Sequence, residues 1–378
     1  MRFVRENLFY VILAAVAVLG GGVATFYYLG SDISRTLQSR TSVSFQLQAL
    51  AGQSLKADPN AVEAMKARIR RLSEANKADL EACLKFNREN LPVMKLKPEG
   101  RTIDEIPAFP FNLQQYNELR LYFTCIQQYT KEFNQVVAPR RPGLWATAPP
   151  TSEELTAEKN NLAEKFKDLA EEKAFQIATL HKAEQGGLVY FDPSATGALH
   201  RVFTHETTAS AEQLWEAQVN LWLTDEIIRA IITTNGKWIA EQQAENPLLK
   251  PSVLNSAVKR IENIKINDVF TAQKTGPAKL SLTQRESCSA YAVLPYSFTV
   301  IMPTRHVRRL IGVLEAQNYH TVTNIALSEA PPAAKAGYYY GIEPVMRVQV
   351  DGEMLLLADW IRDLMPASLA VQYGKVGS

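Results

Sequence analysis

The sequence predicts an α+β protein built in three successive parts: a single N-terminal transmembrane helix, a helical coiled-coil stalk and an α/β head. Three observations predict this order. Residues 8–29 form an uncharged apolar run, residues 30–185 carry heptad-like apolar spacing between proline-rich breaks, and residues 287–378 alternate between strand and helix patterns. With 46% hydrophobic and 21% charged residues, the 378-residue chain has the composition of a folded protein.

The apolar run at residues 8–29 is long enough to cross a membrane. As a helix it would extend about 33 Å, and the hydrocarbon core of a bilayer is about 30 Å thick. Arg2 and Arg5 precede the run, so the positive-inside rule predicts a cytoplasmic tail at residues 1–7 and places the rest of the chain across the membrane. The alternative is a signal peptide cleaved near Ala24, although this run is longer than the usual apolar segment of such peptides.

Small residues recur every four positions within the apolar run, at Ala17, Gly21 and Thr25. This spacing lets two transmembrane helices approach closely, so these three residues are a candidate packing face. Small residues are also common in transmembrane helices that do not pair.

The stalk predicted for residues 30–185 has its clearest heptad at Val62, Met65, Ile69 and Leu72, which repeat at a 3-4-3 spacing on a charged helix. We expect this apolar seam to bind a partner helix. Proline-rich breaks near residues 91–111 and 138–150 interrupt the stalk. The sequence leaves open whether the stalk folds back on itself, which would allow a Cys83–Cys125 disulfide, or pairs between chains.

Residues 186–286 form the first α/β segment of the head. A long helix is predicted from residue 209 to 233, with Trp215 and Trp222 seven residues apart on one face, which is ordinary core spacing. The capping-box sequence at residues 151–154 opens the long helix that precedes this segment and ends near Gln185. A second helix is predicted at residues 251–261, followed by a strand at 262–270.

Residues 287–378 carry the clearest pattern of the chain. Strands are predicted at residues 291–302, 319–328 and 344–351, with an amphipathic helix between the first two. Residues 353–358 either extend the last strand or pair back on it. Strand, helix, strand, loop and strand make up half of a ferredoxin-like α/β sandwich, and the preceding segment supplies the other part.

The sequence contains no motif typical of a catalytic, cofactor or metal site. HExxH, GxSxG, Walker A and GxGxxG motifs are all absent. His200 and His205 are five residues apart, so they do not share one helix face as zinc ligands, and Cys288 has no identifiable histidine and carboxylate partner. Lys and Arg (41) nearly balance Asp and Glu (39), which argues against nucleic-acid binding. We therefore expect a protein that is not an enzyme and has no cofactor, no metal and no small-molecule substrate.

The whole plan resembles the PilO/GspM-type proteins of the inner-membrane alignment complexes of type IV pilus and type II secretion systems. Residues 294–327 are similar to the family's strand that begins Leu-Pro, its following helix and its strand with a Val-x-x-Ile pattern, and residues 344–357 resemble the closing strand. The long helices look most like divergent pilus-operon versions from Verrucomicrobia and related bacteria. The length of the chain and the helix at residues 153–185 depart from the family pattern.

The resemblance implies a non-catalytic scaffold that is anchored in the bacterial inner membrane, with the bulk of the chain in the periplasm. It also implies partners: a PilN-like single-pass protein or a second copy of this chain, bound through coiled coil and head. Two alternatives remain at this point, a periplasmic ligand-binding module and an exported surface protein or adhesin.

Overall fold

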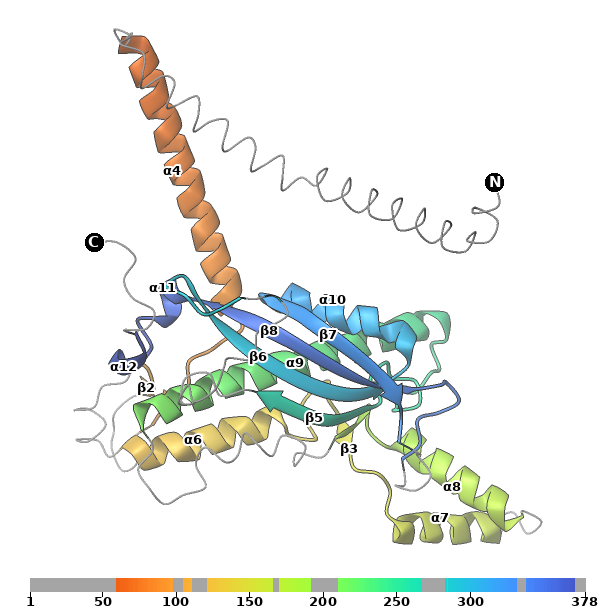
Figure 1. The fold of residues 1–378 in the computed structure, drawn as a ribbon. Helices are drawn as coiled ribbons and strands as arrows, with labels where there is room; N and C mark the ends of the chain where they lie inside the picture. Colours follow the sequence, from red (N-terminus) through yellow and green to blue (C-terminus); the bar gives the residue numbers. More distant parts are fainter. Residues whose placement is uncertain are drawn as a thin grey trace, which may run out of the picture. The chain divides into compact units, whose positions relative to one another are not determined.

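Figure 1 shows the computed structural model, which describes residues 59–97, 105–110, 121–165, 170–191, 210–266, 283, 285–331 and 338–370. The chain divides into two compact units, Met1–Ala78 and Asp79–Ser378. In the first unit the described residues are 59–78, which belong to helix α4 (Pro59–Arg88). The predicted transmembrane segment, with Ala17, Gly21 and Thr25, lies outside the described residues. Among the residues that are described, no helix is long and apolar enough to span a membrane.

The second unit is organised around a mixed six-stranded sheet with the strand order β3-β4-β5-β6-β8-β7 (Figure 1). Strands β3, β4 and β5 run parallel to one another, and β5-β6, β6-β8 and β8-β7 pair antiparallel. The strands are β3 (Ala146–Thr147), β4 (Val189–Phe191), β5 (Arg260–Ile266), β6 (Tyr291–Met302), β7 (His320–Glu329) and β8 (Met346–Leu357). Strands β1 (Lys95–Leu96) and β2 (Ile106–Pro107) form a separate antiparallel pair.

Two successive helix–strand–strand units build most of the sheet. The first unit is α9 (Ala211–Glu245), β5 and β6; the second is α10 (Val307–Gln317), β7 and β8, with a 3-10 turn at Thr304–His306 before α10. Helices α9 and α10 contact each other on one side of the sheet, and α10 contacts β7 (Figure 1). Short helices α11 (Ala358–Ile361) and α12 (Ala367–Ala370) follow β8. The structure is therefore α+β, as the sequence predicts.

The C-terminal strands lie where alternating hydrophobicity places them. Strand β6 coincides with the predicted residues 291–302, β7 is shifted by one residue, and β8 is one continuous strand of 12 residues. Side chains on one face of β6, including Tyr296, Phe298 and Val300, are buried in the main core. The alternation is strong here because one face of the strand packs on helices and the other does not.

Helix α9 is the centre of the main core. It begins with a capping box in which the Gln213 amide donates to Ser210 Oγ (3.2 Å) and the Ser210 amide donates to Gln213 Oε1 (2.9 Å). Trp215 and Trp222 are buried, with ring centroids 5.7 Å apart and perpendicular planes, which confirms their prediction as core residues. The helix extends beyond the predicted end at residue 233 because its buried face continues to Ile239.

Helix α6 (Leu121–Val136) differs from the expected stalk, because it packs on α9. Leu121, Cys125, Tyr129 and Phe133 are spaced four residues apart and are all buried in the main core. A stripe at this spacing serves a head helix as well as a coiled coil, so spacing alone did not distinguish the two. Cys83 is exposed while Cys125 is buried, and no disulfide joins them.

Helices α7 (Ser152–Lys165) and α8 (Glu171–Gln185) replace the single long helix predicted from residue 153 to 185. The predicted capping box is confirmed: the Thr151 amide donates to Glu154 Oε2 (2.8 Å), and the Glu154 amide donates to Thr151 Oγ1 (3.2 Å). Ala170 has an extended backbone immediately before α8. The two helices contact each other and bury apolar side chains at Leu155, Leu162, Ala174 and Ala178.

Residues 251–259 do not form the predicted second helix. The Ser252 amide donates to Asn255 Oδ1 (2.8 Å), so a side chain satisfies a backbone group that a helix would otherwise use. At the end of the segment the Lys259 amide donates to Ile301 O (2.9 Å), and Lys259 O accepts from the Tyr190 amide (2.8 Å). These bonds draw the segment into the sheet, and β5 begins at residue 260.

Candidate partner-binding surface

Helix α4 has the composition of a stable, solvated helix. Its sequence is rich in Ala, Glu, Lys, Arg and Leu, Pro59 stands at its first position, and Lys85 and Arg88 lie in its last turn, where cations favour the helix dipole. Lys66 Nζ lies 3.1 Å from Glu63 Oε1, an exposed ion pair between neighbouring turns. Such pairs support the helix only weakly, so α4 gains little from its charged side chains.

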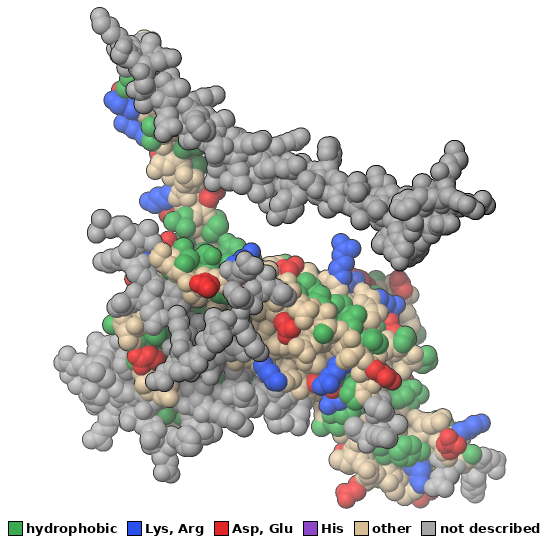
Figure 2. Space-filling view, viewed as in Figure 1, with side chains coloured by type: hydrophobic (Ala, Val, Ile, Leu, Met, Phe, Trp, Pro, Cys, Tyr) green, Lys and Arg blue, Asp and Glu red, His purple; other side chains and the backbone are tan. Residues whose placement is uncertain are grey.

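The four residues of the predicted seam share one side of this charged helix. Met65, Ile69 and Leu72 expose 48%, 66% and 55% of their surface, and Val62 is half-buried. Figure 2 shows hydrophobic side chains beside Lys and Arg side chains on α4. Exposure of three large apolar side chains in a row leaves an unburied stripe at a 3-4 spacing, the geometry that a second helix covers in a coiled coil.

The C-terminal end of α4 is anchored in the second unit by Asn87, whose side chain is fully buried. Its Nδ2 donates to Leu355 O and to Asn318 Oδ1, both at 2.8 Å. Its Oδ1 accepts from the Leu357 amide (2.8 Å) and from Trp360 Nε1 (2.7 Å). Asn318 returns a bond from its own Nδ2 to Asn87 O (3.0 Å). One amide side chain thus connects the helix to β8, to α11 and to Asn318, which lies between α10 and β7.

Sequence reasoning missed Asn87. A single asparagine near the end of a polar helix is usually solvated, and its partners are more than 200 residues away along the chain. A neighbouring contact supports the same junction: the Phe86 and Tyr319 rings meet edge to face with centroids 5.0 Å apart. Burial, with a hydrogen bond to Cys83, raises the pKa of Tyr319 to about 12.

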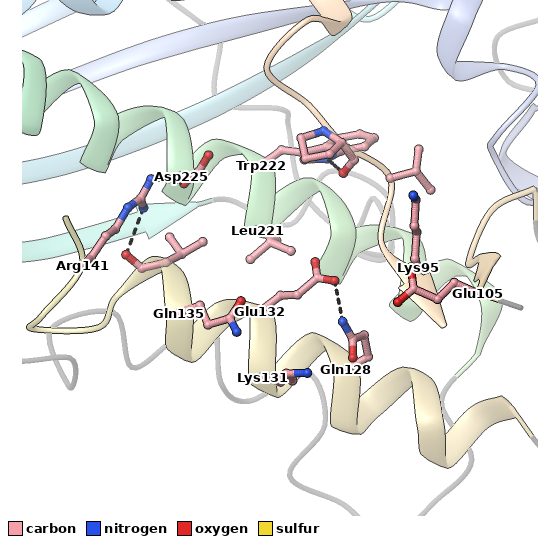
Figure 3. Close-up of a pocket in the computed structure, with 13 residues that line it drawn as sticks. Lys95, Glu105, Gln128, Lys131, Glu132, Gln135, Arg141, Leu221, Trp222 and Asp225 are labelled. Atoms are coloured by element: carbon pink, nitrogen blue, oxygen red, sulfur yellow. Dashed lines mark hydrogen bonds and ion pairs between the residues drawn. The ribbon is translucent and has the colours of Figure 1, made fainter. Parts of the chain in front are cut away.

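A groove of about 530 Å³ lies between α6 and α9, beside β1 (Figure 3). Its walls carry three cationic and three anionic side chains: Lys95, Lys131, Arg141, Glu105, Glu132 and Asp225. Arg141 is already paired with Asp225, at 2.6 Å. Burial raises the pKa of the Glu132 carboxyl, while the hydrogen bond from Gln128 (2.8 Å) lowers it. Balanced charge without a nucleophile gives this groove no defined ligand chemistry.

A buried polar network joins α9 to the sheet. His320 Nε2 lies 3.5 Å from Glu226 Oε2, and its Nδ1 lies 3.2 Å from the Tyr296 hydroxyl. Arg229 donates to Glu226 Oε1 (3.0 Å). The Glu226 and His320 side chains have no exposed surface, so they hold α9, β6 and β7 together and do not face solvent. Across the described part of the chain, no three His, Cys, Asp or Glu side chains are grouped as metal ligands.

His306, at the start of α10, is buried against Trp238 with ring centroids 4.4 Å apart. Burial, followed by the charges of Arg305, Arg309 and Lys259, lowers its pKa to about 4, and Glu241 opposes this. Arg305 Nε also donates to His306 Nε2 (3.1 Å), which requires an unprotonated nitrogen. The folded protein therefore holds this imidazole neutral.

We expect the free energy of unfolding to fall as the pH is lowered from about 6.5 towards 4, because the unfolded histidine binds a proton there and the folded one does not. One such group contributes at most about 1.4 kcal/mol per pH unit. Urea unfolding of the wild type and of His306→Gln at pH 7 and pH 5 tests this. The variant should lose less stability over this interval, and an equal loss in both proteins would contradict the assignment.

These features define an α+β head joined to a long helix with an exposed apolar seam. No protein-family model matches the sequence, and no characterised relative does. Among solved structures, an Akkermansia muciniphila protein is 10% identical, with 64% of this chain and 96% of that one covered and a TM-score of 0.28. A structure without the transmembrane region, from the same organism, is 12% identical over 61% and 95%, with a TM-score of 0.28.

The core region of PilO from the type IV pilus system of Pseudomonas aeruginosa is also similar, at 14% identity over 32% of this chain and 93% of that one, with a TM-score of 0.18. These are distant similarities. At such values they assign neither a family nor a function to this chain.

Proposed function

We propose that this chain is a membrane-anchored, non-catalytic scaffold of a type IV pilus or type II secretion-like machine, and that it acts by binding a partner helix through the α4 seam. The observation that carries the proposal is the exposure of Met65, Ile69 and Leu72 on one side of a charged helix. Large side chains exposed in this way are stabilised when a second helix removes them from water, by about 25 cal/mol for each Å² buried.

Other features support a scaffold. The apolar residues 8–29 would anchor the chain in the inner membrane, with residues 30–378 in the periplasm and Ala17, Gly21 and Thr25 facing a second transmembrane helix. The α9-β5-β6-α10-β7-β8 order and the β5-β6-β8-β7 arrangement correspond to a circularly permuted ferredoxin-like sandwich. This agrees with the resemblance of residues 294–327 to PilO/GspM-type proteins, whose partners are PilN-like proteins or second copies of themselves.

The seam is tested by placing charge in it. The full-length tagged chain is crosslinked in membranes, solubilised gently and purified, and its companions are identified by mass spectrometry. The Ile69→Asp, Leu72→Asp double variant should lose at least tenfold of the recovered partner, because two buried carboxylates in a coiled-coil core cost far more than the 1.4 kcal/mol that tenfold represents.

The matched control is the Ala64→Asp, Ala67→Asp double variant. It adds the same charge to exposed positions of α4 outside the seam, and its partner recovery should stay near the wild-type value. Equal recovery from the seam variant and from the control would overturn the assignment of the seam as the binding surface.

The same purification tests the membrane anchor. A peptide that contains the intact residues 1–7, recovered together with another single-pass coiled-coil protein, supports the scaffold. A mature chain that begins at Thr25 and has no such companion supports the exported-protein alternative instead.

A further inference from the structure

Strand β7 (His320–Glu329) lies at one border of the six-stranded sheet (Figure 1). It pairs with β8 on one side, and among the described residues no strand pairs with its other side. Its last six residues, 324–329, are all exposed. A strand in this position presents a row of unpaired backbone N–H and C=O groups, which is a template for another strand.

The sequence of β7 does not protect this edge. Soluble proteins usually place lysine, proline or an inward charge on a long edge strand, but residues 321–328 (TVTNIALS) contain no charged residue and no proline. The register shift between Val322 and Asn324 disturbs the start of the strand, and pairing with β8 is regular from Asn324 to Glu329. The exposed part of the edge is therefore also its regular part.

Apolar residues that pair across neighbouring strands form rows, and two of these rows extend from the buried core to this edge. Phe298, Val350 and Ile325 stand side by side on three neighbouring strands, because Phe298 pairs with Val350 and Val350 with Ile325. Phe298 and Val350 are buried, whereas Ile325 is 42% exposed. The next row ends in the same way: Leu327 is 52% exposed and lies opposite the buried Val348. Each row ends in an apolar side chain that a further strand would cover.

We propose that β7 of a second copy of this chain pairs antiparallel with β7, about a two-fold axis at Ala326. In this register Ile325 of each copy lies opposite Leu327 of the other, so the four exposed apolar side chains cover one another. Asn324 lies opposite Ser328, and the small Ala326 lies opposite itself. A strand pair of this kind adds backbone hydrogen bonds to cross-strand side-chain contacts and joins the two sheets.

The residue pattern of β7 favours a second copy over an unrelated strand. Residues 324–328 are self-complementary about Ala326, because the apolar Ile325 and Leu327 lie opposite each other and so do the polar Asn324 and Ser328. Residues 321–328 carry no charge, so antiparallel self-pairing over them places no like charges opposite each other.

The inference deepens the proposed scaffold function and rests on it for its biological role, but the two surfaces are tested separately. The test uses the full-length chain in detergent, with the exposed Cys83 and Cys288 replaced by serine. In this background Ala326→Cys should form a covalent dimer under mild oxidation, because directly opposite residues of an antiparallel pair approach within disulfide reach. Ser328→Cys is the matched control: its two copies lie four residues apart along the strands, about 13 Å, and should not crosslink.

A second variant tests the apolar contact without a crosslink. Ile325→Lys, Leu327→Lys should weaken self-association at least tenfold in sedimentation measurements. The control Leu248→Lys, Ile342→Lys changes two exposed apolar side chains away from β7 and should associate like the wild type. Failure of Ala326→Cys to crosslink, equal crosslinking by Ser328→Cys, or unchanged association of the β7 variant would overturn the proposal.

The Ala326→Cys crosslink is also measured in the Ile69→Asp, Leu72→Asp background, which separates the two surfaces. Crosslinking that persists there supports an edge contact independent of the α4 seam, even if the seam itself binds nothing. Crosslinking that disappears would show that the strand contact only follows from the seam, and would overturn β7 as an interface in its own right.

Discussion

The Asn87→Leu variant is expected to lose about 3 to 5 kcal/mol of unfolding free energy, one of the largest effects of any single substitution in this chain. Leucine has a similar volume but can neither donate nor accept a hydrogen bond. The Leu357 amide, the Leu355 carbonyl and the Trp360 indole would then be left without their Asn87 partner. Each buried group left unsatisfied costs about 1–3 kcal/mol, and the terms are not fully additive because the groups share one site.

Denaturant unfolding followed by tryptophan fluorescence measures this loss, and Trp360 also reports directly on the site. The matched control is Asn134→Leu, the same change at an exposed position of α6, which should stay within about 0.5 kcal/mol of the wild type. If Asn87→Leu proves as stable as this control, Asn87 does not anchor α4.

The Gly187→Ala variant is expected to lose about 3 kcal/mol. A Cβ atom on residue 187 would lie 1.7 Å from Trp145 O and 2.7 Å from Trp145 C, far inside contact distance. Both atoms belong to the backbone, so no side-chain rotation relieves the overlap. The chain would have to separate where the Leu188 amide donates to Trp145 O (2.7 Å), next to the parallel pairing of β3 with β4. Forced overpacking of this kind typically costs 1–3 kcal/mol.

Hydrogen exchange at the Ala146 and Leu188 amides, measured together with global unfolding, shows whether the loss is local to this junction. Gly236→Ala and Gly312→Ala are the controls, because a Cβ at either helical position meets no atom within 4 Å. These two variants should gain about 0.5–1 kcal/mol each from the higher helix propensity of alanine. Gly187→Ala with wild-type stability and exchange would contradict the close approach.

The sequence was informative wherever one face of an element is buried and the other is not. The strand at residues 291–302 and the helix after it were located because alternation and a 3-4 spacing are local signals. The same signal misled at α6, because a stripe such as Leu121, Cys125 and Tyr129 does not reveal whether α9 or another chain covers it. Residues 251–259 were misjudged because side-chain hydrogen bonds replaced helical ones.

The α4 seam, the β7 edge and Asn87 also differ in whether the sequence could predict them. The seam residues on α4 were found from spacing alone, since a regular repeat on a charged helix needs no tertiary information; whether they bind a partner stays a prediction. The edge position of β7 could not be predicted from the sequence, because β8 lies between β6 and β7 in the sheet although it follows both along the chain. Asn87 was not found either, since its partners are brought to it only by folding.

The position of the Asn87 bonds determines where mechanical load would enter the head. Through the Asn87 side chain, a pull on α4 would reach residues 355 and 357, at the end of β8. This strand pairs with β6 along its whole length, and its residues 346–354 pair with β7 on the other side. The load is therefore shared by two ladders of hydrogen bonds, whereas a pull on an edge strand would detach it bond by bond. A pull on α4 would therefore be borne by an interior strand of the sheet.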